Sequence, residues 1–147
     1  MDKGYFGDIT WMGFSGKTIP KEIQNTFNHV IKARNLAIKF IEEELSKNRY
    51  PRGIDVDNVV RNYFKKYDIE KYFIHGTGHS LGLQKCHGEQ FNLNQKGEKN
   101  LMEEVPFTIE PGIYYNNKFG VRSEIDCYIK NKKLKISGKI QDEIILI

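Results

Sequence analysis

The chain has 147 residues, a formal net charge of +4 and a hydrophobic fraction of 39%. This length and composition predict one domain with an apolar core, and they exclude a chain that is disordered throughout. No run reaches the roughly 18 apolar residues of a spanning helix, and the segment 1–4 has no basic and apolar leader. We therefore expect a soluble, cytoplasmic protein.

The cysteines and lysines indicate which kinds of site and partner to expect. Cys86 and Cys127 lack the CxxC spacing of a zinc or redox motif, so we expect two reduced thiols. Lysines cluster between 130 and 139, where a solvated strand and turn is favoured over a nucleic-acid patch. The hypothesis of a nucleic-acid-binding domain would rest on charge alone, and it would predict an affinity that falls steeply with salt concentration.

The expected elements alternate between strands and helices. A first strand is expected at about 5–12. Apolar residues then recur at spacings near three and four from about 20 to 46, with Pro20 tolerated in the first turn of this helix. After a break at 50–53, Asp55 is the expected cap of a second amphipathic helix, with an apolar stripe over 56–67.

The second half of the chain is predicted to consist mainly of strands. Alternating and β-branched residues predict them at about 71–75, 79–84, 105–110, 120–129 and 143–147, with a turn at 116–118. The whole pattern predicts an α+β fold.

Three of these strands present an acid in the same manner. Side chains two residues apart share one face of a sheet, so Glu124 lies opposite the apolar row of its strand. Glu110 ends a strand in an extended conformation favoured by Pro111, and Asp8 shares a face with Thr10. Each acid alone is most simply a solvated carboxylate on an exposed face, but their common placement favours a shared role.

A glycine-rich histidine segment adds an imidazole to these acids. His75 and His79 are four residues apart, but Gly76 and Gly78 argue against a helix there, and Gly76 replaces the glutamate of the zincin motif. The glycines let the backbone approach an ion or substrate. His29, on the long expected helix, is assigned to a structural role.

The four candidate ligands are Asp8, His79, Glu110 and Glu124. Three oxygen donors and one imidazole suit manganese, cobalt, iron or zinc better than calcium or a soft copper site. The sequence thus predicts a divalent-metal cage.

Four short motifs carry a resemblance that covers almost the whole chain. They are GYFGDIT at 4–10, HGTGH at 75–79, TIEPG at 108–112 and GVRSE at 120–124. In this order they resemble the pita-bread metallopeptidases, the group of Xaa-Pro aminopeptidase and prolidase, with methionine aminopeptidase and creatinase as relatives. The Gly-x-Arg-x-Glu form of the last motif favours the Xaa-Pro branch.

The resemblance implies a fold, a reaction and a set of roles. The fold would be two helices packed on a curved antiparallel sheet, and the reaction would cleave Xaa-Pro peptides or dipeptides by attack of a metal-bound hydroxide. Manganese would be the favoured ion, with Asp8 and Glu124 bridging two metals. Glu110 would shuttle the proton. The remaining roles would fall to His75 and His87 on the substrate side, and to Arg122 and Thr10, which would hold carboxylate ligands in place.

The chain departs from the family pattern upstream of its first motif. The family supplies another aspartate ligand there, and Asp2 is too close to Asp8 to match it. We therefore expect residues 1–147 to be the C-terminal portion of a single catalytic domain, truncated at its N-terminus and able to retain one of the two ions.

Other departures concern single positions. His87 follows the ligand histidine one residue later than usual, Trp11 stands where an arginine is common, and Ile125 replaces an acid. Trp11 is interpreted as a core or interface aromatic.

Two functional hypotheses remain open. The first is a metal-dependent exopeptidase, active alone or only with its N-terminal half. The second is a catalytically impaired remnant or peptide-binding module of the same fold. The expected partners are a peptide substrate and either a second copy or the missing half, since truncation exposes apolar surface; neither nucleic acid nor a membrane is expected.

Overall fold

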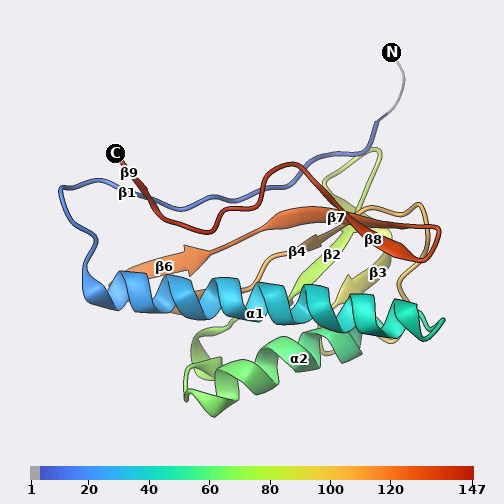
Figure 1. Cartoon of the computed structure of the whole chain (residues 1–147), viewed down its shortest axis with the longest axis horizontal. Helices are drawn as coiled ribbons and strands as arrows, with labels where there is room; N and C mark the ends of the chain where they lie inside the picture. Colours follow the sequence, from blue (N-terminus) through green and yellow to red (C-terminus); the bar gives the residue numbers. More distant parts are fainter. Residues whose placement is uncertain (1–3) are drawn as a thin grey trace.

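The computed structural model describes residues 4–147. The expectation about a leader in segment 1–4 concerns mainly Met1, Asp2 and Lys3, which lie outside the described residues. Two helices cover one side of a central sheet, and the chain's two ends run along the other side (Figure 1). The elements are β1 (Gly13–Phe14), α1 (Lys21–Ser46), α2 (Gly53–Lys66), the 3₁₀ helix η1 (Glu70–Tyr72), β2 (Gly78–Leu81), β3 (His87–Leu93), β4 (Phe107–Ile109), β5 (Gly112–Tyr115), β6 (Phe119–Arg122), β7 (Ile125–Lys130), β8 (Lys133–Ser137) and β9 (Ile145–Leu146).

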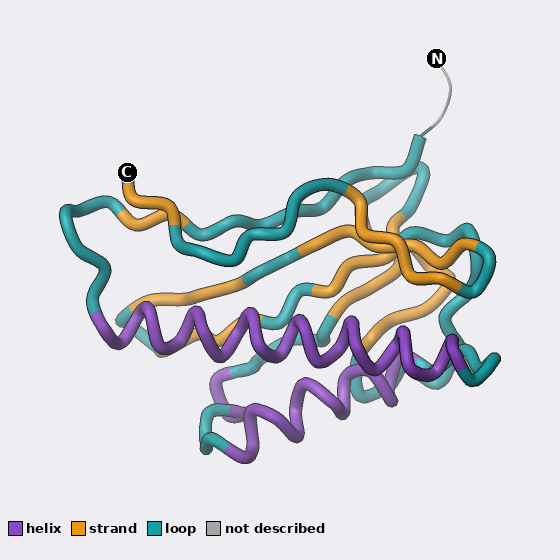
Figure 2. The backbone as a smooth tube through the Cα atoms, in the orientation of Figure 1, coloured by secondary structure: helices purple, strands orange, loops and turns teal. Residues whose placement is uncertain are grey.

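The central sheet is antiparallel and has the strand order β3-β2-β4-β7-β8. β5 and β6 form a separate hairpin, and β1 pairs in parallel with β9, so the segment around β1 lies beside the C-terminal segment (Figure 2). The expected α+β class is confirmed.

Both helices form where the apolar periodicity predicts them. α1 begins directly after Pro20 and buries Phe27, Val30 and Ile41 against the sheet and α2. α2 begins two residues before Asp55, so the expected capping position of Asp55 is wrong. Asp55 lies instead in the first turn, where its carboxylate accepts a hydrogen bond from the backbone N–H of Arg52 at 3.2 Å.

Two expected strands are absent from the described structure. The segment 5–12 forms only an isolated bridge between Thr10 and Glu124, because the backbone N–H of Asp8 donates to the Asp126 side chain instead of to a neighbouring strand. The segment 71–75 is partly 3₁₀ helix and partly irregular, since Arg61 binds the carbonyls of Phe73 and His75. In both segments a side chain takes the place of a ladder partner.

The other strand expectations hold with shifted boundaries. The strand expected at 120–129 divides at Ser123 into β6, which pairs with β5, and β7, which pairs with β4. The turn at 116–118 is confirmed, with the Lys118 N–H donating to the Tyr115 carbonyl at 3.0 Å. Strands β3, β5 and β8 were not expected, although β5 overlaps the TIEPG motif.

A buried arginine ties α1 to the chain's C-terminal segment. Arg34 is fully buried, and its Nη1 donates to Ser123 Oγ at 2.8 Å and to the Gln141 carbonyl at 2.7 Å. Its Nη2 pairs with Asp142 at 2.9 Å. Gln141 in turn bonds both backbone groups of Met12. One guanidinium therefore holds together the strand that leads to Glu124 and the segment that carries Thr10.

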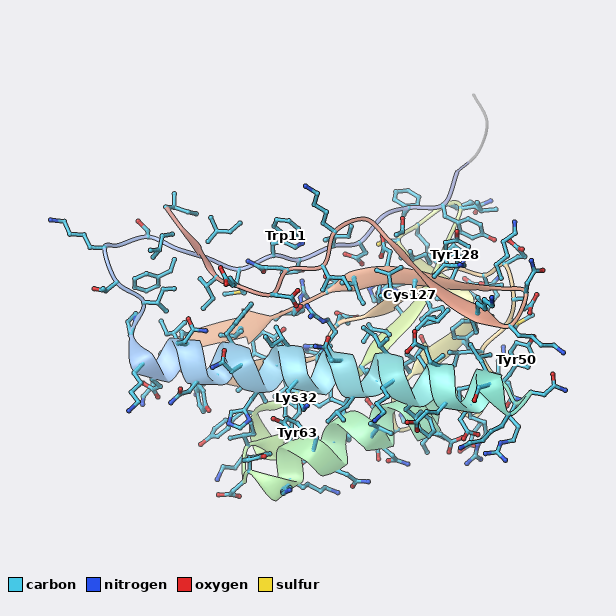
Figure 3. The ribbon with its side chains drawn as sticks, in the orientation of Figure 1. Trp11, Lys32, Tyr50, Tyr63, Cys127 and Tyr128 are labelled. Carbon is cyan, nitrogen blue, oxygen red and sulfur yellow. The ribbon has the colours of Figure 1, made fainter. Side chains whose placement is uncertain are left out.

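Large apolar side chains are exposed along the paired terminal segments. Trp11 points away from the helices (Figure 3) and is 44% exposed, so it is not a core residue. The others in this group are Tyr5, Phe6, Ile9, Ile145, Leu146 and Ile147. The lysines of 130–139 are exposed on the end of β7, the following turn and β8, which is an edge strand. This exposure favours a solvated strand and turn over a nucleic-acid patch.

Among residues 4–147, no helix combines the length and the apolar character needed to cross a membrane.

The Arg34 network predicts a measurable loss of stability. Replacing Arg34 with Met leaves the Gln141 carbonyl and the Ser123 hydroxyl buried without a donor, which lowers the unfolding free energy by about 2–4 kcal/mol. Urea denaturation measures this change. Lys39→Met, an exposed position on the same helix, should change it by less than about 0.5 kcal/mol. Equal losses in the two variants would contradict the structural role of Arg34.

Candidate metal centre

Three of the four predicted ligands converge on one point. One ligand atom from each of Asp8, His79 and Glu124 lies within 4.8 Å of the other two. These residues come from the N-terminal segment, from β2 and from the junction before β7, so the fold brings together positions more than a hundred residues apart. The simpler alternative of a solvated carboxylate on an exposed face does not hold for Glu124, which is only 1% exposed, or for Glu110, which is 9% exposed.

The local backbone fixes the orientation of His79. Gly78 packs against β4 so closely that an added Cβ would lie 2.0 Å from the Thr108 carbonyl oxygen. His79 Nδ1 lies 3.0 Å from the Ser80 carbonyl, to which it can only donate. In the neutral ring the lone pair is then on Nε2, which faces the carboxylates of Asp8 and Glu110, each at 3.5 Å. This is the arrangement of a metal-ligating histidine.

Glu110 lies beside this group but does not join it. Its carboxylate is 3.4 Å from Arg122 Nη1 and 3.4 Å from Thr108 Oγ1. Its backbone N–H donates to the Thr77 carbonyl at 2.7 Å, which ties the end of β4 to the HGTGH segment. Its role as a fourth ligand remains a prediction.

Thr10 and Arg122 hold the Glu124 carboxylate. Thr10 Oγ1 donates to Glu124 Oε2 at 2.5 Å, and Arg122 Nε donates to Thr10 Oγ1 at 3.2 Å. Arg122 Nε also lies 3.6 Å from Glu124 Oε2. Both residues therefore have the contacts that their predicted positioning role requires.

The electrostatics of the group favour a cation. Burial, and next the charge of Glu124, raise the pKa of Glu110 to about 7. Burial also raises the pKa of Glu124, and the charge of Asp8 adds to the effect. A divalent ion between these oxygens would compensate the desolvation and repulsion. Together with the free Nε2 of His79, the donor set therefore fits a divalent metal.

The two other predicted histidines flank the group differently. The ring of His87 stacks on that of His79, with centroids 3.7 Å apart and planes 12° apart. His75 has both ring nitrogens engaged: Nδ1 lies 2.7 Å from the Gly76 carbonyl, and Nε2 lies 2.9 Å from the Tyr114 hydroxyl. Burial lowers the pKa of both histidines, which favours their neutral forms.

All of the site residues predicted from the sequence, except Thr10, border one open cavity of about 480 Å³. Its lining residues are Asp8, His75, Gly76, Gly78, His79, His87, Asn92, Asn94, Glu110, Arg122 and Glu124. Asn92 of β3 and Asn94, which follows β3, form a polar wall that is suited to contact a peptide backbone.

Three residues at the centre were missed from the sequence. Asp126, on the face of Glu124, accepts the Asp8 N–H at 3.0 Å while its Oδ1 is buried without a partner. The thiol of Cys86 donates to Asp8 Oδ2 at 2.9 Å, and Tyr114 bonds to His75. The period of two could have identified Asp126, but no sequence pattern pointed to the other two.

Two helices on an antiparallel sheet, with carboxylates and an imidazole gathered at a cavity, define a candidate divalent-metal centre in an α+β fold. The profile of metallopeptidase family M24 matches residues 1–131, and the chain belongs to this family.

Individual relatives agree with this assignment. A putative Xaa-Pro aminopeptidase of Mycoplasma pneumoniae is 33% identical over 139 residues, which are 93% of this chain and 37% of that protein. Crystal structures of a recombinant prolidase from Thermococcus sibiricus and of a dipeptidase from Pyrococcus horikoshii OT3 superpose with TM-scores of 0.84 and 0.83. Each is 32% identical; the matches cover 97% of this chain and 36% and 38% of the two structures. The expected pita-bread fold is confirmed, and this chain spans little more than a third of the length of these proteins.

The raised pKa of Glu110 predicts a pH-dependent stability in the presence of a chelator. Because the folded state binds the Glu110 proton more tightly than the unfolded state, Glu110 lowers the unfolding free energy as pH rises from about 4.5 to about 7. The full effect is on the order of 3 kcal/mol. Glu110→Gln removes it, so the stability of this variant relative to wild type should increase across this window. A difference that is constant with pH in urea denaturation would contradict the raised pKa.

Proposed function

We propose that this chain carries the metal centre of an exopeptidase of the Xaa-Pro type, which releases an N-terminal residue from Xaa-Pro peptides or splits Xaa-Pro dipeptides. The observation that supports this best is the convergence of Asp8, His79 and Glu124. The ion would be manganese, with cobalt, iron and zinc as alternatives that the same donors accept. The names of the Mycoplasma pneumoniae and Thermococcus sibiricus relatives support the substrate class.

When bound, the ion would polarise the scissile carbonyl and lower the pKa of a water molecule. Glu110 would accept a proton from the attacking water and deliver it to the leaving nitrogen. A carboxyl group whose pKa lies near neutral can do both at one pH. Arg122 and Thr10 would keep Glu124 in its binding orientation.

The histidines would act on the substrate side. His87 lies on the open side of His79 and can donate to a peptide carbonyl or to the oxyanion that forms from it. His75 would first have to release Gly76 or Tyr114, because both ring nitrogens are engaged. We therefore assign His87 the more direct contact.

One ion is proposed for this chain. Three donors converge on a single point among the described residues, which suits one divalent ion. The exposed apolar side chains along the terminal segments suit association with a second copy or with the N-terminal half of a longer catalytic domain.

The second candidate function is a catalytically impaired remnant or peptide-binding module. It predicts that peptide binds in the cavity without being cleaved.

Metal titration tests the centre directly. Isothermal titration of manganese should give one ion per chain, and His79→Ala should weaken binding by more than the roughly 10- to 100-fold that loss of an outer partner costs. His29→Ala is the matched control, because His29 lies between the helices and bonds to Tyr63. Two ions per chain, or equal affinity in the two variants, would contradict the proposed centre.

Hydrolysis of an Ala-Pro peptide with added manganese tests the reaction. It should be measured for this chain and for a form extended upstream. Glu110→Gln should lower kcat by about 10²- to 10⁴-fold, because the proton shuttle is lost. Turnover equal to wild type would remove Glu110 from proton transfer, and peptide binding without turnover in both forms would favour the impaired module.

A further inference from the structure

The loop 73–77 connects η1 to β2 and carries one side of the cavity. It has no regular secondary structure, yet it places His75 at the cavity and leads directly into His79. Backbone partners hold its two ends: the Phe73 N–H donates to the Glu70 carbonyl at 2.9 Å, and the Thr77 N–H donates to the Leu93 carbonyl at 2.7 Å. Two side chains of α2 add to these contacts: Arg61 binds the Phe73 and His75 carbonyls, and Asp57 shares the Thr77 N–H.

Asp57 is a fully buried carboxylate with four donors. Its Oδ1 accepts the backbone N–H of Thr77 at 3.0 Å and the Thr77 hydroxyl at 2.8 Å. Its Oδ2 accepts Arg61 Nε at 2.7 Å and Gln95 Nε2 at 2.6 Å. The charge is thus paired and hydrogen-bonded, which is the condition under which burial of a carboxylate is tolerated.

Arg61 binds the preceding part of the same loop. Its Nη2 donates to the His75 carbonyl at 2.7 Å, and its Nη1 donates to the Phe73 carbonyl at 3.3 Å. The guanidinium also lies over the Phe73 ring, 4.6 Å from its centroid. Glu70, at 3.2 Å from Nη1, completes its ion pairing. A planar fork of donors suits a loop that presents several carbonyls.

Thr77 transmits this anchoring to the metal centre. Its carbonyl accepts the Glu110 N–H at 2.7 Å, and it precedes Gly78, which packs on the Thr108 carbonyl. The next residue, His79, donates its N–H to Thr108 Oγ1 at 3.1 Å. A shift of Thr77 would therefore move both the imidazole of His79 and the start of the Glu110 side chain.

Gln95 extends the network to the opposite wall. It follows Asn92 of β3 and Asn94, which both line the cavity, and it donates to both Asp57 and Asn58. The single carboxylate of Asp57 thus joins α2 to two walls of the cavity.

We propose that Asp57 and Arg61 are positioning residues of the metal centre, which act through Thr77 to hold His79 and Glu110 in their converging orientation. Neither side chain borders the cavity, so neither is assigned contact with substrate or ion. The proposal rests on the proposed function of the centre, but its geometric part can be tested without metal.

Four variants separate positioning from general stability. Asp57→Asn places an amide against the donors of Arg61 and Gln95, and Thr77→Val removes only the hydroxyl that Asp57 accepts. Thr77→Ser restores that hydroxyl. Val60→Ala removes a buried side chain of α2 that packs in the core, and it serves as the control for destabilisation alone.

The first measurement is amide hydrogen exchange by NMR in the presence of a chelator. In Asp57→Asn and Thr77→Val, the amides of His79 and Glu110 should exchange about tenfold faster, relative to core amides of α1, because the loop opens locally. Thr77→Ser and Val60→Ala should keep the wild-type ratio. If Asp57→Asn does not fold, the two Thr77 variants decide the matter.

The second measurement is zinc affinity by calorimetry. Asp57→Asn and Thr77→Val should bind zinc about 10- to 100-fold more weakly, while Thr77→Ser and Val60→Ala should bind like wild type. Unchanged exchange ratios in both Asp57→Asn and Thr77→Val, or equal effects of Val60→Ala, would overturn the positioning role. Faster exchange in Asp57→Asn and Thr77→Val, together with a wild-type chain that binds no zinc, would support the positioning role and refute the metal centre.

Discussion

Three carboxylates of like charge share a small, largely buried volume beside one imidazole, and the rest of the structure is arranged around them. Desolvation and mutual repulsion make this concentration unfavourable, as the raised pKa values of Glu110 and Glu124 record. Folding must therefore hold the groups together by other means. A divalent cation turns the same arrangement into a favourable one, which is why metal binding and the stability of this fold are expected to be coupled.

The restraints come from both sides of the sheet. On the helix side, the apolar cores of α1 and α2 fix the strands, and Arg34 and Asp57 convert that packing into hydrogen bonds at Ser123 and Thr77. On the other side, Thr10 and Arg122 bind the carboxylate of Glu124 directly. These hydrogen bonds thus fix the polar site relative to the rigid apolar core, as preorganised centres require.

The sequence predicted the helices well, because period 3.6 in apolar residues is a local signal. It failed for β3, whose segment HGEQFNL is mostly polar, and for 5–12 and 71–75, where side chains replace ladder partners. The candidate ligands followed from strand faces and from the family resemblance. Their distances did not, and neither did the link between Asp57 and Thr77, which joins the second helix to the HGTGH motif across 20 positions and leaves no periodic signal in the sequence.

The metal centre depends on His79, whose Nε2 nitrogen must carry a lone pair that can bind the shared cation. Imidazole nitrogen NMR of this chain, recorded before and after addition of zinc, tests it most directly. The account predicts a His79 ring protonated on Nδ1, with an Nε2 resonance that shifts to the coordinated range when zinc binds, while the signals of His29 stay in place. A His79 ring protonated on Nε2 and unaffected by saturating zinc would contradict it.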